Sequence, residues 1–227
     1  MTAPIECLVE VGTKRTFAAA EAWPGWCRSA REAAGALEAL LAYGERYAAA
    51  LADGGPRFTP PASVRGLSVA ERAPGNATTE FGAPDAVFDA DAEPISGPGW
   101  GRLRSILEAC WTSFDRAAAD ADGVALRKGP RGGGRELEAI VAHVAGAEAS
   151  YLRRLTGATV KVDESDPWAS WTVERAAVLD GLDRAKAGTL PESGPRGGAM
   201  WTPRRFLRRA AWHVLDHAWE IEDRATG

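Results

Sequence analysis

Residues 203–225, PRRFLRRAAWHVLDHAWEIEDRA, decide the fold of the C-terminal half. Thr202 is a good N-cap, Pro203 suits the first position of a helix, and apolar residues then recur at helical spacing. His213 and His217 are four residues apart, so they lie within about 40° of each other on one face of this helix. The stretch therefore predicts a long amphipathic helix that presents two imidazoles together.

The chain contains only three histidines, and the third, His143, lies in the middle of another helical pattern, 135–156. Neutral imidazole is the commonest zinc ligand and also suits nickel, iron and copper. A helical pair alone is equally explained by two hydrogen-bonded histidines near a core, but three histidines on two neighbouring helices indicate a ligand set. We therefore predict a divalent metal on His143, His213 and His217. All three lie on the flank of an apolar stripe, so we expect the site to open at one side or end of the helices.

Four helical patterns follow one another in the C-terminal half, and they predict an all-α four-helix bundle over residues 98–227. They cover 100–121, 135–156, 171–187 and 203–225.

Residues 1–81 predict a small α+β module that precedes the bundle. Residues 6–11 alternate as a strand does, and a second strand is expected within 14–23. An Ala- and Leu-rich run predicts one long helix over 29–51, and weaker alternation predicts a third strand within 64–72.

This β-β-α-β order, with Trp23-Pro24-Gly25-Trp26 just before the helix, resembles the HicB-like fold of small antitoxin-type domains over about residues 5–75. The helix start departs from the family's Gly-Asp-Thr type and reads Arg28-Ser29-Ala30-Arg31 instead, so toxin neutralisation is not carried over. We expect the module to pack on the bundle or to mediate homodimer contacts.

Between the two parts, residues 82–97 are rich in Gly, Pro, Ala and Asp. Pro84 and Pro94 interrupt any regular element there. We therefore expect an interdomain linker that is exposed and poorly packed, and a bundle that folds without the N-terminal module.

Composition and charge exclude several classes of protein. The chain of 227 residues is 45% hydrophobic and 26% charged, which suits a globular protein with a buried core. Its net charge of −4 comes from interspersed acidic and basic residues, so we expect no nucleic-acid partner. No run approaches the ~18 apolar residues of a membrane span and no export signal is recognisable, which predicts a cytoplasmic protein without a membrane partner. The three cysteines lack C-x-x-C spacing, which indicates reduced thiols.

A family resemblance rests on two stretches, LEAIVAHVAGAEASYL at 137–152 and WHVLDHAWEIEDR at 212–224. They resemble the DinB-like superfamily of metal-binding four-helix bundles, whose mark is one histidine on the second helix and an H-x-x-x-H pair on the fourth. The resemblance covers about residues 98–227 and implies the same three histidines as metal ligands. Three imidazoles at this spacing suit zinc or nickel, so we expect one of these two ions.

In the better understood members of this superfamily the ion binds a low-molecular-weight thiol, mycothiol in actinobacteria, as a thiolate that attacks an electrophile. The resemblance thus implies a metal-dependent thiol S-transferase or a thiol-dependent isomerase with a small-molecule substrate. Three protein ligands leave at least one coordination position open, as catalytic sites do. A metal-dependent hydrolase is the alternative on the same atoms, and a non-catalytic protein that binds a metal or a small molecule is the competing class.

Glu220 lies about 20° from His213 around the helix, on the face that carries the ligands. It is a candidate to orient an imidazole or to act as the catalytic base, and a solvated surface glutamate is the alternative. Five tryptophans of this half are expected to pack in the core or at its rim, or to form the wall of an apolar pocket over the ion. They are Trp168, Trp171, Trp201, Trp212 and Trp219.

Overall fold

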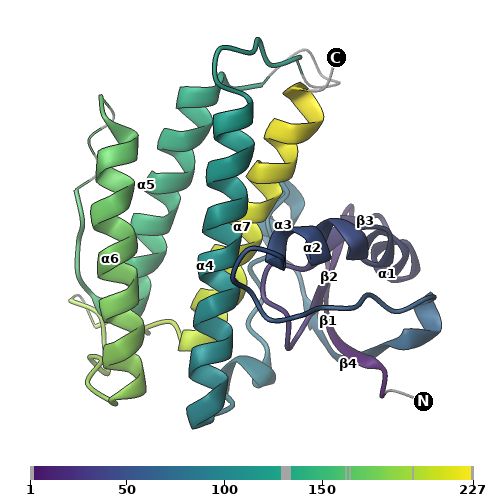
Figure 1. The fold of residues 1–227 in the computed structure, drawn as a ribbon. Helices are drawn as coiled ribbons and strands as arrows, with labels where there is room; N and C mark the ends of the chain where they lie inside the picture. Colours follow the sequence, from purple (N-terminus) through teal and green to yellow (C-terminus); the bar gives the residue numbers. More distant parts are fainter. Residues whose placement is uncertain (1–2, 129–133, 162, 164, 196, 226–227) are drawn as a thin grey trace.

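The computed structural model describes residues 3–128, 134–161, 163, 165–195 and 197–225. The chain is an α+β protein. The N-terminal half contains a four-stranded sheet, and four long helices of the C-terminal half lie side by side next to it (Figure 1). In the part of the chain described, no helix combines the length and the apolar character needed to cross a bilayer.

The sheet has the strand order β3-β2-β1-β4. Its strands are β1 (Ile5–Val11), β2 (Thr16–Ala20), β3 (Cys27–Ala30) and β4 (Leu67–Pro74), the last preceded by the 3-10 turn η1 (Val64–Gly66). β1 pairs with β2 antiparallel and with β4 parallel, and β2 pairs with β3 antiparallel. The strand expected within 14–23 is therefore confirmed, and the one expected within 64–72 is present but runs from Leu67 to Pro74.

The single long helix expected over 29–51 is wrong. Residues 27–30 form β3, and the rest forms two helices, α1 (Ala33–Ala42) and α2 (Gly44–Leu51). Pairing of β3 with β2 overrides the helical propensity of its residues. The break falls at Tyr43 because the Leu40 carbonyl accepts hydrogen bonds from the Trp26 indole (2.8 Å) and from the Tyr43 amide (3.1 Å). The order in this half is thus β-β-β-α-α-β, in place of β-β-α-β.

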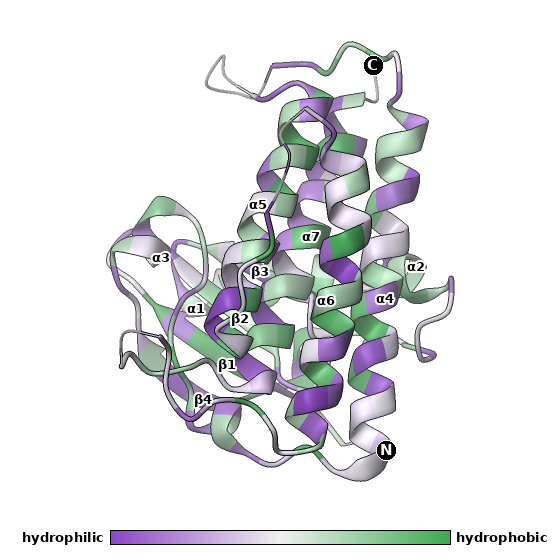
Figure 2. Ribbon diagram, turned by 90° about the vertical axis from the view of Figure 1, so that its left-hand side faces the viewer, coloured by the Kyte–Doolittle hydropathy of each residue, from purple (hydrophilic) through white to green (hydrophobic). Residues whose placement is uncertain are grey.

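The four long helices are α4 (Gly97–Asp120), α5 (Leu137–Thr156), α6 (Pro167–Lys186) and α7 (Pro203–Ala225). α6 begins four residues before the expected position because Asp166 caps its N-terminus and Pro167 is its first residue. α7 packs against α4 and α5, and α5 also packs against α6. The visible turns of α4 and α6 carry both hydrophobic and hydrophilic residues (Figure 2), as expected of helices that bury one side.

Both faces of the sheet are covered. One face, which carries Phe17 and Ala19, packs against Trp212 of α7. The opposite face, which carries Val9 and Ala18, packs with α1 in the main core. Because β2 is covered from both sides, all five of its residues are buried.

Residues 82–97 are exposed in part, at Val87 and at residues 92–94, but other positions of the segment are packed inside the molecule. They follow the short helix α3 (Ala77–Phe81), include the 3-10 turn η2 (Asp89–Ala92), and bury Phe88 and Asp91. The buried carboxylate of Glu10 on β1 accepts hydrogen bonds from the amides of Asp85 and Ala86, both at 2.9 Å. Composition reveals that this segment lacks periodicity, but it cannot reveal that a buried carboxylate satisfies its backbone amides.

One apolar cluster continues from the sheet side of the molecule into the long helices. At its centre Gly25, in the left-handed region at φ +96°, lies so close to α7 that a Cβ would be 2.9 Å from Leu215 Cδ1. Tyr47 of α2 donates a hydrogen bond to the Pro24 carbonyl at 2.8 Å in the same region. Cys7, Cys27 and Cys110 are buried free thiols. The division at 82–97 into separately folding domains stays a prediction, and the two parts share this core.

Candidate metal centre

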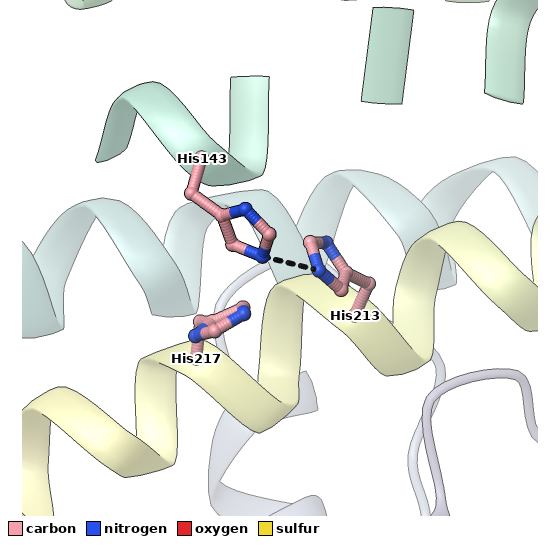
Figure 3. A group of neighbouring side chains, drawn as sticks. All are labelled: His143, His213 and His217. Atoms are coloured by element: carbon pink, nitrogen blue, oxygen red, sulfur yellow. Dashed lines mark hydrogen bonds between the residues drawn. The ribbon is translucent and has the colours of Figure 1, made fainter. Parts of the chain in front are cut away.

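His143 of α5 and the pair His213 and His217 of α7 meet between the two helices, and their rings face one another (Figure 3). The ring centroids are 5.1 Å apart for His143 and His213, 5.0 Å for His143 and His217, and 4.7 Å for His213 and His217. The two histidines on α7 meet because of their four-residue spacing, and the third joins them because α5 packs against α7.

The nitrogen separations fit joint coordination of one ion. In a tetrahedral zinc site each imidazole nitrogen lies about 2.0–2.1 Å from the ion, so two ligand nitrogens are about 3.3–3.4 Å apart. The Nε2 atoms of His143 and His213 are 3.3 Å apart, and the candidate ligand atoms of all three histidines lie within 4.8 Å of one another. A hydrogen bond between two neutral imidazoles gives the same contact, so the metal content of the protein decides between them.

Burial favours the neutral, ligand-competent form of two of these imidazoles. The His213 side chain is buried, and burial lowers its pKa well below the usual value, with further lowering by His217 and by the positive charge of Arg209. Burial also lowers the pKa of His143 to about 4, helped by His217 and Arg135. Because a metal ligand must be unprotonated, neither ring has to lose a proton at neutral pH before it can bind an ion.

Glu220 lies where it can orient one of the ligands. Its Oε2 is 2.7 Å from Nδ1 of His217, and its Oε1 accepts a hydrogen bond from Nη1 of Arg224 at 2.8 Å. The hydrogen bond with His217, followed by the Arg224 contact, lowers the pKa of this carboxyl against the effect of burial. A carboxylate on Nδ1 leaves Nε2 of His217 for an ion, which is the usual arrangement around a metal-binding histidine.

The N-terminal half holds α7 in place through ion pairs. Arg28 of β3 pairs with Asp216 at 2.9 Å, and Arg46 of α2 pairs with both Glu222 and Asp223. Both arginines lie more than 170 positions before these acidic residues in the chain. The face of α7 that carries Asp216, Glu222 and Asp223 lies next to the face that carries the histidines.

A further anchor joins α7 to the segment that follows α3. Nη2 of Arg208 contacts Oδ2 of Asp91 at 2.6 Å, Nε contacts Oδ1 at 3.1 Å, and both side chains are buried. Nη2 of Arg208 also donates to the Ala86 carbonyl at 3.0 Å. The two hydrogen bonds between Arg208 and Asp91 set the geometry of this buried ion pair. The pair therefore fixes the position of the helix that carries two of the three histidines.

The sequence matches no protein-family model, and no curated protein and no solved structure matches it. Function therefore has to be inferred from the site itself.

Aromatic side chains surround His213. The rings of Tyr151 and Trp212 lie 5.8 Å and 5.9 Å from its imidazole, centroid to centroid, and Trp201 stacks on Tyr151 at 5.4 Å. Two of the five tryptophans singled out in the sequence thus gather near the histidines. Sequence reasoning missed Tyr151 and Arg209, although both lie at helical spacing from a histidine: eight residues after His143 and four before His213.

The other tryptophans belong elsewhere. Trp168 and Trp171 stack, with ring centroids 5.8 Å apart, in the wall of a cleft of about 640 Å³ between the end of α4 and the starts of α5 and α6. The three histidines do not line this cleft. Trp219 packs instead against Tyr43, which immediately precedes α2, at 5.1 Å.

Proposed function

We propose that this protein is a metal-dependent enzyme of the DinB-like type, in which residues 98–227 form a four-helix bundle that holds zinc or nickel on His143, His213 and His217. The proposed reaction is transfer of a low-molecular-weight thiol such as mycothiol to a small electrophile, or a thiol-dependent isomerisation. One observation carries the proposal: the three histidines of the chain converge from two helices, with a 3.3 Å Nε2 to Nε2 separation that suits a shared ion.

When bound, the ion lowers the pKa of a coordinated thiol or water and so supplies a nucleophile at neutral pH. The residues around it have distinct tasks in this proposal. The three imidazoles leave at least one coordination position for the ligand. Glu220 orients His217 and is the candidate base that holds a proton during transfer, while Arg224 keeps the carboxylate of Glu220 in position.

The N-terminal half supports this site in the proposal, and no toxin-related role is assigned to it. Its arginines Arg28 and Arg46 hold α7 from the side, and the sheet covers Trp212. Its HicB-like resemblance remains a proposal about fold.

Two alternatives use the same residues. A metal-dependent hydrolase needs the same ion and the same open position, with water in place of the thiol. Two observations favour a non-catalytic protein that retains a metal. The aromatic rings of Tyr151 and Trp212 lie beside His213, and the cleft of about 640 Å³ is not lined by the histidines.

Cobalt substitution separates these possibilities. Full-length protein is loaded with cobalt and titrated with 2-mercaptoethanol and mycothiol, because sulfur-to-cobalt charge transfer absorbs where nitrogen and oxygen ligands do not. The proposal expects a new near-ultraviolet band that saturates with thiol. A spectrum that no thiol alters, but that a carboxylate or phosphate analogue does alter, would replace the S-transferase by the hydrolase. A spectrum that responds to no ligand would favour the non-catalytic protein.

A further inference from the structure

Arg209 lies one helical turn before His213 on α7, and its side chain is half-buried. Its Nε and Nη1 atoms are nevertheless buried, and none of the residues that the structure describes gives them a hydrogen-bond partner. In the described part of the chain its guanidinium carbon lies over two aromatic rings, 4.7 Å from the centroid of Trp212 and 5.2 Å from that of Tyr151.

The neighbouring arginines of the same helix differ from it in this respect. Arg204 donates to the Glu93 carbonyl at 2.8 Å, Arg205 pairs with Asp85 at 3.4 Å, and Arg208 pairs with Asp91. Burying charged donors without acceptors is costly. Ring faces offset part of that cost, but they do not accept the in-plane N–H groups of a guanidinium. Arg209 is therefore built to receive an acceptor that the described residues do not supply.

The position of Arg209 links it to the histidines. Four residues correspond to about 6 Å along the helix axis, and both arginine and histidine side chains of a helix lean toward its N-terminus. The two rings under the guanidinium, Tyr151 and Trp212, are the same rings that flank His213 at 5.8 Å and 5.9 Å. The guanidinium and the imidazoles thus border one aromatic region.

We infer that Arg209 binds the carboxylate of a small organic acid whose other end coordinates the ion held by the three histidines. The inference rests on the proposed function and adds the chemical class of the ligand. A guanidinium fork matches a carboxylate in shape, and one carboxylate carries the single negative charge that balances one unpaired arginine. The separation of about one helical turn suits an acid with its coordinating atom two or three carbons from the carboxylate.

The test compares a thiol acid with its neutral ester. Full-length cobalt-substituted protein is titrated with 3-mercaptopropionate and with its methyl ester, which has the same thiol but no charge, and the dissociation constants are read from the cobalt spectrum. Wild-type protein should bind the acid at least tenfold more tightly than the ester. Arg209→Gln should remove this preference, and Arg205→Gln, which changes an arginine paired with Asp85 on the same helix, should keep it. Equal binding of acid and ester to wild type, or an unchanged preference in Arg209→Gln, overturns the inference.

Two further arms keep this result separate from that of the proposed function. If neither thiol alters the cobalt spectrum, the thiol chemistry fails. The carboxylate site is then judged with 3-hydroxypropionate and its methyl ester by tryptophan fluorescence of the zinc-loaded protein. A preference for the acid that Arg209→Gln removes supports Arg209, and its absence refutes it. If the Arg209→Gln protein loses its metal, Arg209→Lys is tested instead. The lysine keeps the positive charge but not the forked guanidinium, so it should bind the acid several-fold more weakly than wild type and the ester with unchanged affinity.

Discussion

At the scale of single residues, His213 and His217 need only a helix to come together, whereas His143 reaches them only because α5 packs against α7. The same distinction applies to the residues around them. Glu220 lies on the ligand face by spacing alone and contacts His217 at 2.7 Å. Arg209 also lies near that face by spacing, but the sequence does not indicate that its Nε and Nη1 are buried with no hydrogen-bond partner among the described residues.

Metal content should depend on each histidine. We expect wild-type protein purified without a histidine tag to hold about one equivalent of zinc or nickel, because three imidazoles at this spacing suit either ion. His213→Ala, which removes the most buried of the three, should lose most of the metal in elemental analysis. Asp216→Asn is the matched control, since it alters α7 between the two histidines but faces Arg28. Full occupancy in all three single alanine variants would show that the cluster is only a hydrogen-bonded group.

Glu220→Gln should weaken the site without emptying it. Loss of a carboxylate that holds a metal-binding histidine typically lowers metal affinity by about 10–100-fold. The measurement is competition with a coloured chelator, and the same variant should slow any thiol transfer. Glu222→Gln is the control, because that carboxylate contacts Arg46 and not a histidine. Equal affinities in the two variants would assign Glu220 to the surface charge of the helix.

At the scale of elements, α6 contains a feature that the apolar pattern does not explain. Glu174 is 0% exposed, and in the part of the chain that the structure describes neither of its carboxylate oxygens has a hydrogen-bond partner. Nearby Glu148 of α5 is also buried, but it accepts hydrogen bonds from the indoles of Trp111 and Trp171, both at 2.8 Å. Burial, followed by repulsion from Glu148, raises the pKa of Glu174 to about 9. A carboxyl in this environment is protonated at neutral pH.

Glu174 should therefore make the protein less stable as the pH rises. In the unfolded chain the carboxyl loses its proton near its ordinary pKa of 4.5, whereas in the folded chain it keeps the proton until about pH 9. Between these values the folded state binds more protons, so the free energy of unfolding falls with increasing pH, by roughly 3 kcal/mol at pH 7. Glu174→Gln should remove this dependence.

Urea unfolding of wild type and Glu174→Gln at pH 5, 7 and 9 measures the effect. The stabilisation by glutamine should grow from pH 5 to pH 9. Glu138→Gln, an exposed position on α5, is the control and should follow wild type. Parallel pH profiles for wild type and Glu174→Gln would mean that Glu174 has a partner or contact with solvent.

At the scale of the whole molecule, the sheet and the long helices are joined by three kinds of contact. They share an apolar cluster, the ion pairs of Arg28 and Arg46 reach α7, and the Arg208–Asp91 pair fixes the segment between the halves. The helix that carries two of the three histidines is therefore positioned by residues from both halves.

A fragment that starts at Ser96 should consequently be less stable than the full chain. It uncovers Trp212 and removes the partner of Arg208, and removing one member of a buried ion pair typically costs about 3–5 kcal/mol. The composition of residues 82–97 predicts that the bundle folds on its own, but because the two halves share a core we expect the fragment to keep the circular dichroism of a helical protein, to bind a hydrophobic dye and to lose its cooperative melting transition. A fragment that melts as cooperatively as the full chain and retains one equivalent of metal would instead establish two independent domains.

The sequence by itself predicted the four long helices, the α+β character of the N-terminal half and the three histidines as one group. These depend on periodicity and on spacing within a helix, which are local properties of the chain. Only the tertiary structure placed residues 27–30 in a strand, because that strand exists through its pairing with β2. Likewise, only the tertiary structure bonded Ala86 to Glu10 and Arg208, and left buried polar atoms of Arg209 and Glu174 without a hydrogen-bond partner among the described residues. Burial and pairing are set by groups distant in the sequence, so no local pattern reports them.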